Sequence, residues 1–158
     1  MALEIEQWTA EHPRWPELWA VVARLGQERW MDAVFEWHRS HHVLAALEDG
    51  AVAGFLRFVV QDIGPEEDHD LLIFNGAALT EAKVLAFGVP EERRNRGVGR
   101  ALQLAAMAAA RGLGCYQMRS HSGGESVANH HLKLALGFAV YPVLRGDDTA
   151  GVYFIKAL

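Results

Sequence analysis

The chain lacks the features that mark several common protein classes. It has a single cysteine, Cys115, so it can form no internal disulfide and offers no CxxC pair for zinc. Its formal net charge of -5 disfavours a nucleic-acid binder with a broad basic face. No apolar run approaches the ~20 residues that a membrane helix needs, and the N-terminal segment is acidic where a signal peptide would be basic. These absences predict a cytoplasmic protein that binds neither nucleic acid nor a membrane.

The composition is that of one globular domain. Hydrophobic residues make up 51% of the 158 positions, which is enough apolar surface for a core. No internal repeat, low-complexity tract or linker divides the chain, so we expect a single domain over residues 1–158. The predicted order is one strand, two helices, three strands, a helix, a strand, a helix and two strands, which is an α/β layout.

Turn and breaker residues set the boundaries of the first elements. Apolar residues recur at helical spacing over 17–37 and are interrupted at Gly26, which predicts two helices. The apolar runs on either side of Asp49-Gly50 predict an antiparallel hairpin within 43–60. Segment 83–89 predicts a strand that Pro90 stops, and the alanine-rich stretch 98–111 predicts a helix.

The remaining segments predict a loop, a turn and the C-terminal elements. Residues 61–70 carry five carboxylates together with Gly and Pro, which predicts a solvated loop. Asn75-Gly76 predicts a further turn. Segment 115–120 predicts a strand and 125–136 a helix, and the apolar runs within 140–158 predict a last hairpin.

The stretch VPEERRNRGVGRAL, Val89 to Leu102, gathers four arginines and two glycines at the start of the long helix. A helix N-terminus carries partial positive charge and amide hydrogens without an intrahelical partner, so it stabilises an anion. Gly97 and Gly99 lack a Cβ, which lets a phosphate approach those amides, and the arginines add charged donors. The stretch predicts a diphosphate site. The alternative is a solvated turn whose arginines pair with Glu91 and Glu92.

This stretch resembles the acetyl-CoA-binding motif of the GNAT superfamily of N-acetyltransferases. In that family a strand ending in hydrophobic-x-Val-x-Pro precedes [QR]-x-x-G-x-[GA], and Arg94, Gly97 and Gly99 fill the second pattern. A second signature, a helix ending in Leu-Gly-Phe before a strand, is matched at 136–138. Other phosphate motifs do not fit: no GxxxxGK[ST] run exists, and the GxGxxG fingerprint would need a third glycine where Leu102 stands.

The resemblance implies both a fold and a co-substrate. The implied fold is a mixed, mostly antiparallel sheet of six or seven strands, splayed at the acyl-CoA site and flanked by about four helices. The implied co-substrate is acetyl-CoA, with its thioester in a slot beside 115–120. The implied CoA-binding residues are the strand-edge residues Phe87, Gly88 and Val89, the diphosphate-binding residues Arg94, Asn95, Arg96, Gly97, Val98, Gly99 and Arg100, and Ser126 and Asn129 on the later helix.

The chain departs from the family at both usual catalytic positions. The tyrosine that often protonates the leaving thiolate is replaced by Lys133, which either is buried, with a lowered pKa that suits a proton donor, or faces solvent. The common glutamate position on the incoming strand is Lys83. Because an amine attacks in its neutral form, another base is needed. Glu81, on the same strand face as Lys83, is the first candidate, and His121 is the second.

Each candidate base also has a structural interpretation. Glu81 could instead form an ion pair or simply be exposed, and His121 could be a surface histidine without a catalytic role. The other histidines have no cysteine or carboxylate at a familiar metal spacing, so we expect no metal site. Either Trp30 or Trp37 could line the acceptor pocket, which the first two helices border in the family. If the acidic loop lies beside that pocket, it favours a cationic acceptor such as a polyamine, an aminoglycoside or a lysine-like amine.

We therefore expect an acyl-CoA-dependent N-acyltransferase that moves an acetyl group from acetyl-CoA to a primary amine, small or peptide, by direct attack in a ternary complex. A covalent route through Cys115 is disfavoured because thiols in buried strands are usually inert. The alternative function is a non-catalytic acyl-CoA-binding sensor or partner module, because both usual catalytic side chains are missing. A dinucleotide oxidoreductase is a more distant third. Exposed edges of the last hairpin are compatible with a homodimer.

Overall fold

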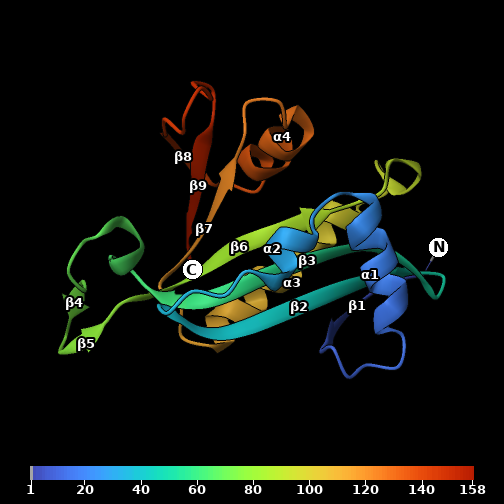
Figure 1. Ribbon diagram of the computed structural model, residues 1–158, viewed down its shortest axis with the longest axis horizontal. Helices are drawn as coiled ribbons and strands as arrows, with labels where there is room; N and C mark the ends of the chain where they lie inside the picture. The colour runs from blue at the N-terminus through green and yellow to red at the C-terminus, as the bar shows by residue number, and fades with distance from the viewer. Residues whose placement is uncertain (1) are drawn as a thin grey trace.

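A seven-stranded mixed sheet organises the molecule, in a computed structural model that describes residues 2–158 (Figure 1). The strand order is β1-β2-β3-β6-β7-β9-β8, and β6 and β7 are the parallel pair among antiparallel neighbours. A separate two-stranded hairpin projects from one end (Figure 1). The strands are β1 (Leu3–Trp8), β2 (His38–Glu48), β3 (Ala51–Asp62), β4 (Ile73–Phe74), β5 (Ala77–Ala78), β6 (Thr80–Gly88), β7 (Gln117–Ser122), β8 (Ala139–Pro142) and β9 (Val152–Ala157).

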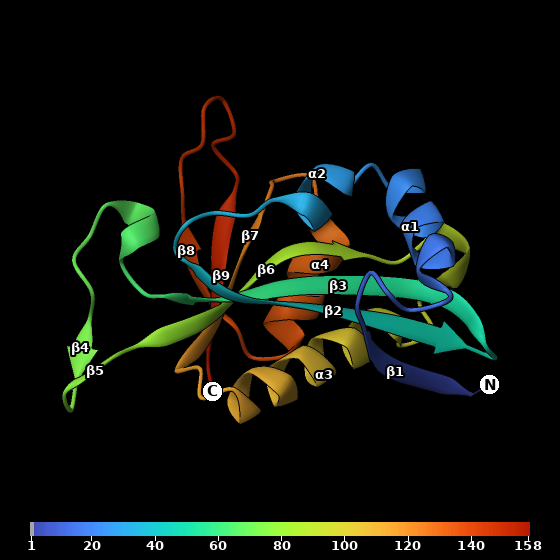
Figure 2. The same cartoon turned by 60° about the horizontal axis from the view of Figure 1, so that its bottom comes forward.

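Helices cover both faces of the sheet (Figure 2). The long α3 packs on one face over an apolar core that includes Leu56, Phe58 and Leu102. On the other face α1 packs over a second core that includes Leu18 and Phe55, and α2 lies beside it. The helices are α1 (Trp15–Arg24), α2 (Glu28–Asp32), α3 (Val98–Gly112) and α4 (Val127–Ala135), with the short 3-10 turns η1 (Pro65–Glu67) and η2 (Glu91–Arg93). Over residues 2–158, none of these helices has both the length and the hydropathy of a membrane span.

The architecture confirms the predicted α/β sheet and the element order. The turns fall where the sequence places them, with φ of 49° at Asp49 and 81° at Gly50, and 51° at Asn75 and 78° at Gly76. Several boundaries differ, among them the start of β2 at His38 and the span of β7 over Gln117–Ser122. The second helix ends at Asp32, because the chain turns there to enter β2. The strand predicted over 83–89 begins earlier, at Thr80.

The sheet splits between β6 and β7, and this split positions the site. The two strands pair from Glu81 opposite Gln117 to Val84 opposite Ser120. Beyond these residues β6 continues to Gly88 alongside β3, whereas β7 continues to Ser122 alongside β9. In Figure 1 the two halves of the sheet diverge here, with α4 beside β7. Each strand therefore presents a main-chain edge to the gap.

Leu102 offers a test of the core beneath α3. Its side chain is fully buried, so the variant Leu102→Ala should lower the free energy of unfolding by about 2–5 kcal/mol through lost burial and the cavity left behind. Urea denaturation measures this loss. Leu104→Ala on the same helix is the matched control, because Leu104 is 40% exposed, and its effect should stay below about 1 kcal/mol. Equal losses in the two variants would contradict the packing described.

Candidate active site

A cavity of about 820 Å³ runs through the gap between β6 and β7. On one side it reaches the N-terminus of α3 and the first turns of α4. On the other side it reaches Leu25, Gln27 and Trp30, near α2. The cavity therefore joins a helix N-terminus on one face of the sheet to the α2 region on the other. Its walls between these ends are the β6 residues 84–88 and the β7 residues 120–122.

The N-terminus of α3 is open to the cavity. Gly97 is the cap residue, with a left-handed φ of 83°, and within residues 2–158 no side chain caps the amides of this first turn. Each of the residues predicted to hold the diphosphate, 94–100, lies in or next to the cavity wall; all but Arg96 line it. A Cβ on Gly99 would lie 3.2 Å from the Phe87 ring and 3.4 Å from Leu132. The glycine thus keeps the passage between β6 and α4 open.

Two of the four arginines are held by a buried carboxylate that the sequence did not indicate. Glu48, at the end of β2, is 2% exposed, and its Oε1 accepts hydrogen bonds from Arg93 Nη1 at 2.9 Å and Arg96 Nη1 at 2.6 Å. Arg94 Nε donates to the Val89 carbonyl at 2.9 Å. These bonds fix the loop before α3, and they replace the local pairing with Glu91 and Glu92 considered from sequence. Arg100 also lines the cavity.

The β6 edge is partly occupied by a side chain from the other face. Gln27 Oε1 accepts from the Phe87 amide at 3.0 Å, and Gln27 Nε2 donates to the Phe87 carbonyl at 2.8 Å. Gly88 and Val89 also line the cavity. Both main-chain groups of Phe87 are therefore satisfied by an amide side chain, the same chemical group that a pantetheine arm presents. Nothing in the local sequence around Gln27 indicates this contact.

Lys133 is the most unusual side chain in the cavity wall. It is 1% exposed, its Nζ donates to Ser120 Oγ at 2.9 Å, and Nζ lies 4.6 Å from the centre of the Phe138 ring. Burial lowers the pKa of Lys133 to about 7, because an apolar environment penalises the charged amine. The buried alternative stated above is thus the correct one, and the solvent-facing alternative is wrong.

The neighbouring α4 residues also face the cavity. Asn129 Nδ2 donates to Ser122 Oγ at 3.1 Å, and its Oδ1 is buried without a hydrogen-bond partner among the described residues. Ser126, the cap residue of α4, makes no side-chain cap bond. Both residues line the cavity, so their polar atoms are available to a ligand there.

His121 lies at the β7 side of the cavity, inside the strand rather than just past it. Its ring packs edge-on against Tyr153, with centroids 5.6 Å apart. Burial, assisted by the charge of Arg145, lowers the pKa of His121, so the imidazole is neutral at physiological pH. Its Nε2 is buried and has no hydrogen-bond partner in the part of the chain that is described. A neutral ring nitrogen without a partner is suited to accept a proton.

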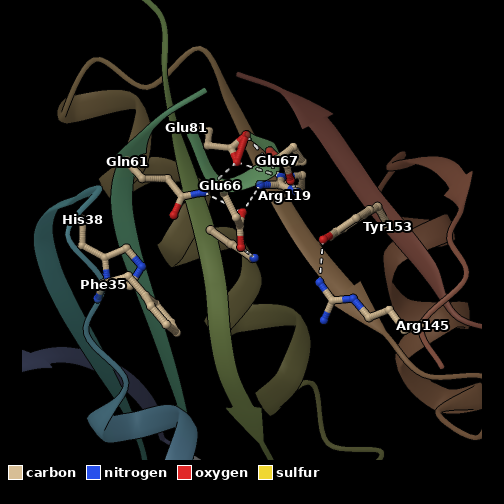
Figure 3. Close-up of polar contacts among 10 residues, drawn as sticks. Phe35, His38, Gln61, Glu66, Glu67, Glu81, Arg119, Arg145 and Tyr153 are labelled. Atoms are coloured by element: carbon tan, nitrogen blue, oxygen red, sulfur yellow. Dashed lines mark hydrogen bonds and ion pairs between the residues drawn. The ribbon is translucent and has the colours of Figure 1, made fainter. Parts of the chain in front are cut away.

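Glu81 lies outside the cavity, in a buried ionic cluster (Figure 3). Its side chain is 1% exposed and accepts from Arg119 Nε at 2.8 Å, and Gln61 and Gln117 donate to the same carboxylate at 3.3 and 3.1 Å. As predicted, it shares a strand face with Lys83. These bonds favour the ion-pair interpretation of Glu81, because each bond stabilises the ionised carboxylate.

The acidic loop is solvated over residues 67–70, as its composition predicts, but one glutamate departs from this. The side chain of Glu66 turns inward and pairs with Lys83 and with Arg119, whereas Glu67 pairs with Arg119 at 2.6 Å and stays about half exposed (Figure 3). Asp62 pairs with Arg39 at 2.6 Å. Lys83 and Arg119 are buried cations that need a negative partner, so Glu66 is more stable paired with them than hydrated at the surface.

The structure also places the candidate tryptophans, Cys115 and the predicted thioester slot. Trp30 lines the cavity, whereas Trp37 is absent from its wall. Cys115 is buried beneath α3, away from the cavity wall, and burial raises its thiol pKa. The slot borders 120–123 instead of 115–120, because pairing with β6 persists as far as Ser120. Across residues 2–158 no group of three or more His, Cys, Asp or Glu is placed to hold a metal ion.

Comparison with known proteins identifies this arrangement. The model of the acetyltransferase (GNAT) family matches residues 4–138. The chain belongs to this family. As a GNAT protein it is an N-acetyltransferase. No curated protein sequence matches the chain.

Solved structures show the same fold across the whole chain. Arabidopsis thaliana NAA60 in complex with acetyl-CoA superposes with a TM-score of 0.73 at 15% identity, over 99% of each chain. A Bacillus subtilis acetyltransferase in complex with CoA superposes with a TM-score of 0.66 at 19% identity, also over 99% of each chain. At such identities the likeness extends to the fold of this GNAT protein and not to its acceptor.

Gly99 tests whether the passage beside α3 holds CoA. In Gly99→Val the added side chain would enter the space between Phe87, Val89 and Leu132, so we expect CoA affinity to fall at least about tenfold by calorimetry. Gly112→Val, at the other end of α3, is the matched control, because a Cβ there meets nothing within 4 Å and CoA affinity should not change. Unchanged affinity in Gly99→Val would contradict the assignment.

Proposed function

We propose that this GNAT protein transfers the acetyl group of acetyl-CoA to a primary amine by direct attack in a ternary complex. The observation that carries the proposal is the continuous cavity between β6 and β7, with Lys133 on its α4 side and His121 on β7. The open N-terminus of α3 would hold the diphosphate through the amides and side chains of 94–100. From there the pantetheine arm would run along the β6 edge at Gly88 and Val89, because Gln27 already pairs with the main chain of Phe87. Ser126 and Asn129 would face the arm from α4.

A through-sheet cavity suits direct attack because the two substrates can enter from opposite faces. The thioester arrives from the α3 and α4 side, and the amine arrives from the side of α2 and Trp30. Arabidopsis thaliana NAA60 has also been solved with a bisubstrate analogue, at 16% identity and a TM-score of 0.68 to this chain. An analogue that joins both substrates requires both sites to be filled together in that protein. Main-chain amides near Val89 would stabilise the developing oxyanion.

The proton on the leaving group would come from Lys133. Attack of the amine nitrogen on the carbonyl carbon forms the new C–N bond, and collapse of the tetrahedral intermediate breaks the C–S bond and releases a thiolate. A thiolate with an ordinary thiol pKa near 8.5 is readily protonated by an ammonium group whose pKa is about 7. Ser120 orients Nζ through the 2.9 Å hydrogen bond and can accept hydrogen bonding from either protonation state.

The proton on the attacking nitrogen would go to His121. Its Nε2 has no hydrogen-bond partner among the described residues, and its lowered pKa keeps the ring neutral before attack. The geometry favours His121 over Glu81, because the Glu81 carboxylate is committed to Arg119 and lies outside the cavity. The base would thus come from β7 in place of the usual glutamate on β6.

The Lys133 proposal predicts a specific pH profile. As an acid, Lys133 must be protonated, so kcat should decline as pH rises through about 7, the pKa that burial gives it. Lys133→Met should lower kcat at least about 100-fold while CoA affinity, measured by calorimetry, changes little. Lys133→Tyr should restore part of kcat and move the alkaline limb upward, because a phenol has a pKa near 10. An unshifted limb in Lys133→Tyr would exclude Lys133 as the acid.

His121, as the proposed base, should determine the acid limb of the pH profile. Its pKa lies below 6.5, so kcat/KM should decline only when the pH falls beneath that value, as the ring becomes protonated. We expect His121→Gln to reduce kcat about 100-fold and to abolish this acid limb, measured by thiol release with a panel of amines. His131→Gln is the matched control, because His131 is exposed on α4 and outside the cavity wall. CoA binding without thiol release from any amine would instead support the sensor function.

A further inference from the structure

Several cations gather around the Tyr153 ring, which lies next to His121 and outside the cavity wall. The guanidinium carbons of Arg119 and Arg145 lie 4.6 and 5.4 Å from the centre of the Tyr153 ring, and Lys83 Nζ lies 6.0 Å from it. Arg145 Nη2 also donates to the Tyr153 hydroxyl at 2.6 Å (Figure 3). The same ring packs against His121. Tyr153 therefore links Arg145 directly to the proposed base.

These cations differ in whether a carboxylate already neutralises them. Arg119 and Lys83 pair with the glutamates of the inward-turned loop, and Arg119 also pairs with Glu81. Arg145 has no carboxylate within 4 Å among residues 2–158, and its side chain is exposed. Among residues 2–158 its guanidinium makes one hydrogen bond, to the Tyr153 hydroxyl. Arg145 is thus a charged, exposed donor that lies against Tyr153 and has no carboxylate partner among residues 2–158.

Arg145 leaves an unpaired positive charge on the surface near His121. The charge of Arg145 contributes to the lowered pKa of both His121 and Lys83, although the direct pair with Glu66 opposes the shift at Lys83. An acceptor that carries only positive charge is repelled from such a surface. An acceptor with a carboxylate beside its amine is attracted, and the same positive charge helps its ammonium group to lose a proton.

We propose that the acceptor is an amine that also carries a carboxylate, and that Arg145 and the Tyr153 hydroxyl bind this carboxylate while the amine faces His121. The inference rests on the proposed function and narrows its substrate class. Arginine presents five donors in a planar fork, so the bond to Tyr153 leaves donors for a carboxylate. The hydroxyl accepts from Arg145, and its own hydrogen remains for the same anion. This assignment replaces the cationic acceptor expected from the acidic loop, whose glutamates Glu66 and Glu67 are already paired.

The test compares acceptors that differ only in the anion. Thiol release from acetyl-CoA is followed with the standard α-amino acids and with their primary amides, which keep the amine and lose the negative charge. We expect kcat/KM for the preferred amino acid to exceed that for its amide by about 10- to 100-fold, as a charge-assisted hydrogen-bond pair supplies. Equal rates with the amide would overturn the proposal.

Variants of Arg145 and Tyr153 test whether these residues cause the preference for acids over amides. Arg145→Gln should lower the acid-to-amide ratio about 10- to 100-fold, mainly through KM, and Arg145→Lys should recover part of it by restoring the charge without the fork. Tyr153→Phe should lower the ratio by a smaller factor. Arg111→Gln is the matched control, because Arg111 is an exposed arginine at the far end of α3, and its ratio should equal that of the unmodified protein. An unchanged ratio in Arg145→Gln would also overturn the proposal.

A binding measurement separates this inference from the proposed function. N-acetyl amino acids and N-acetyl amino acid amides cannot be acetylated, so calorimetry of both with the CoA complex reports carboxylate binding without turnover. Affinity for the acids that Arg145→Gln removes would support the carboxylate site even if no amine released thiol, a result that would refute only the proposed function. No preference for the acids over the amides would refute the carboxylate site, whether or not thiol is released.

Discussion

The separation of β6 from β7 is the constraint on which the rest of this structure depends. Two parallel strands that pair over only four residues leave main-chain groups unpaired inside the protein, and such groups are costly unless something satisfies them. Gln27 satisfies both main-chain groups of Phe87 from one face of the sheet. The opening exists because β7 follows β9 away from β6, so the C-terminal hairpin and the cavity form one structural unit.

The parts predicted correctly from sequence are those that local chemistry dictates. Gly97 adopts a left-handed φ at the start of an apolar helix, and Asp49-Gly50 and Asn75-Gly76 form turns because their residues tolerate positive φ. Alternating apolar residues place Glu81 and Lys83 on one strand face. Each of these features depends on a few consecutive residues. The same is true of the two family motifs, which is why the fold could be assigned from them.

The parts that sequence did not predict depend on partners far away in the chain. Glu48 and Arg96 are 48 residues apart, Gln27 and Phe87 are 60 apart, and Glu66 and Arg119 are 53 apart. No local sequence pattern predicts such pairings, because glutamate and glutamine are usually exposed and would be predicted to lie on the surface. The acidic loop shows the consequence: its composition correctly predicts exposure of 67–70, but not that two buried cations on neighbouring strands pair with Glu66.

Burial of Lys133 connects the stability of this protein to its chemistry. Lowering an amine pKa from 10.5 to about 7 disfavours the charged form in the folded state by on the order of 5 kcal/mol. The unfolded chain keeps the ordinary pKa and binds the proton more tightly, so this cost is fully present below pH 7 and disappears as the pH rises toward 10.5. The protonated form that the proposed acid step requires is therefore the form that destabilises the fold. A tyrosine at this position would avoid that cost, because a phenol with a pKa near 10 is neutral while it still carries its proton. In the proposed acid step, a buried lysine would supply a stronger acid than a phenol near neutral pH, at a cost in stability.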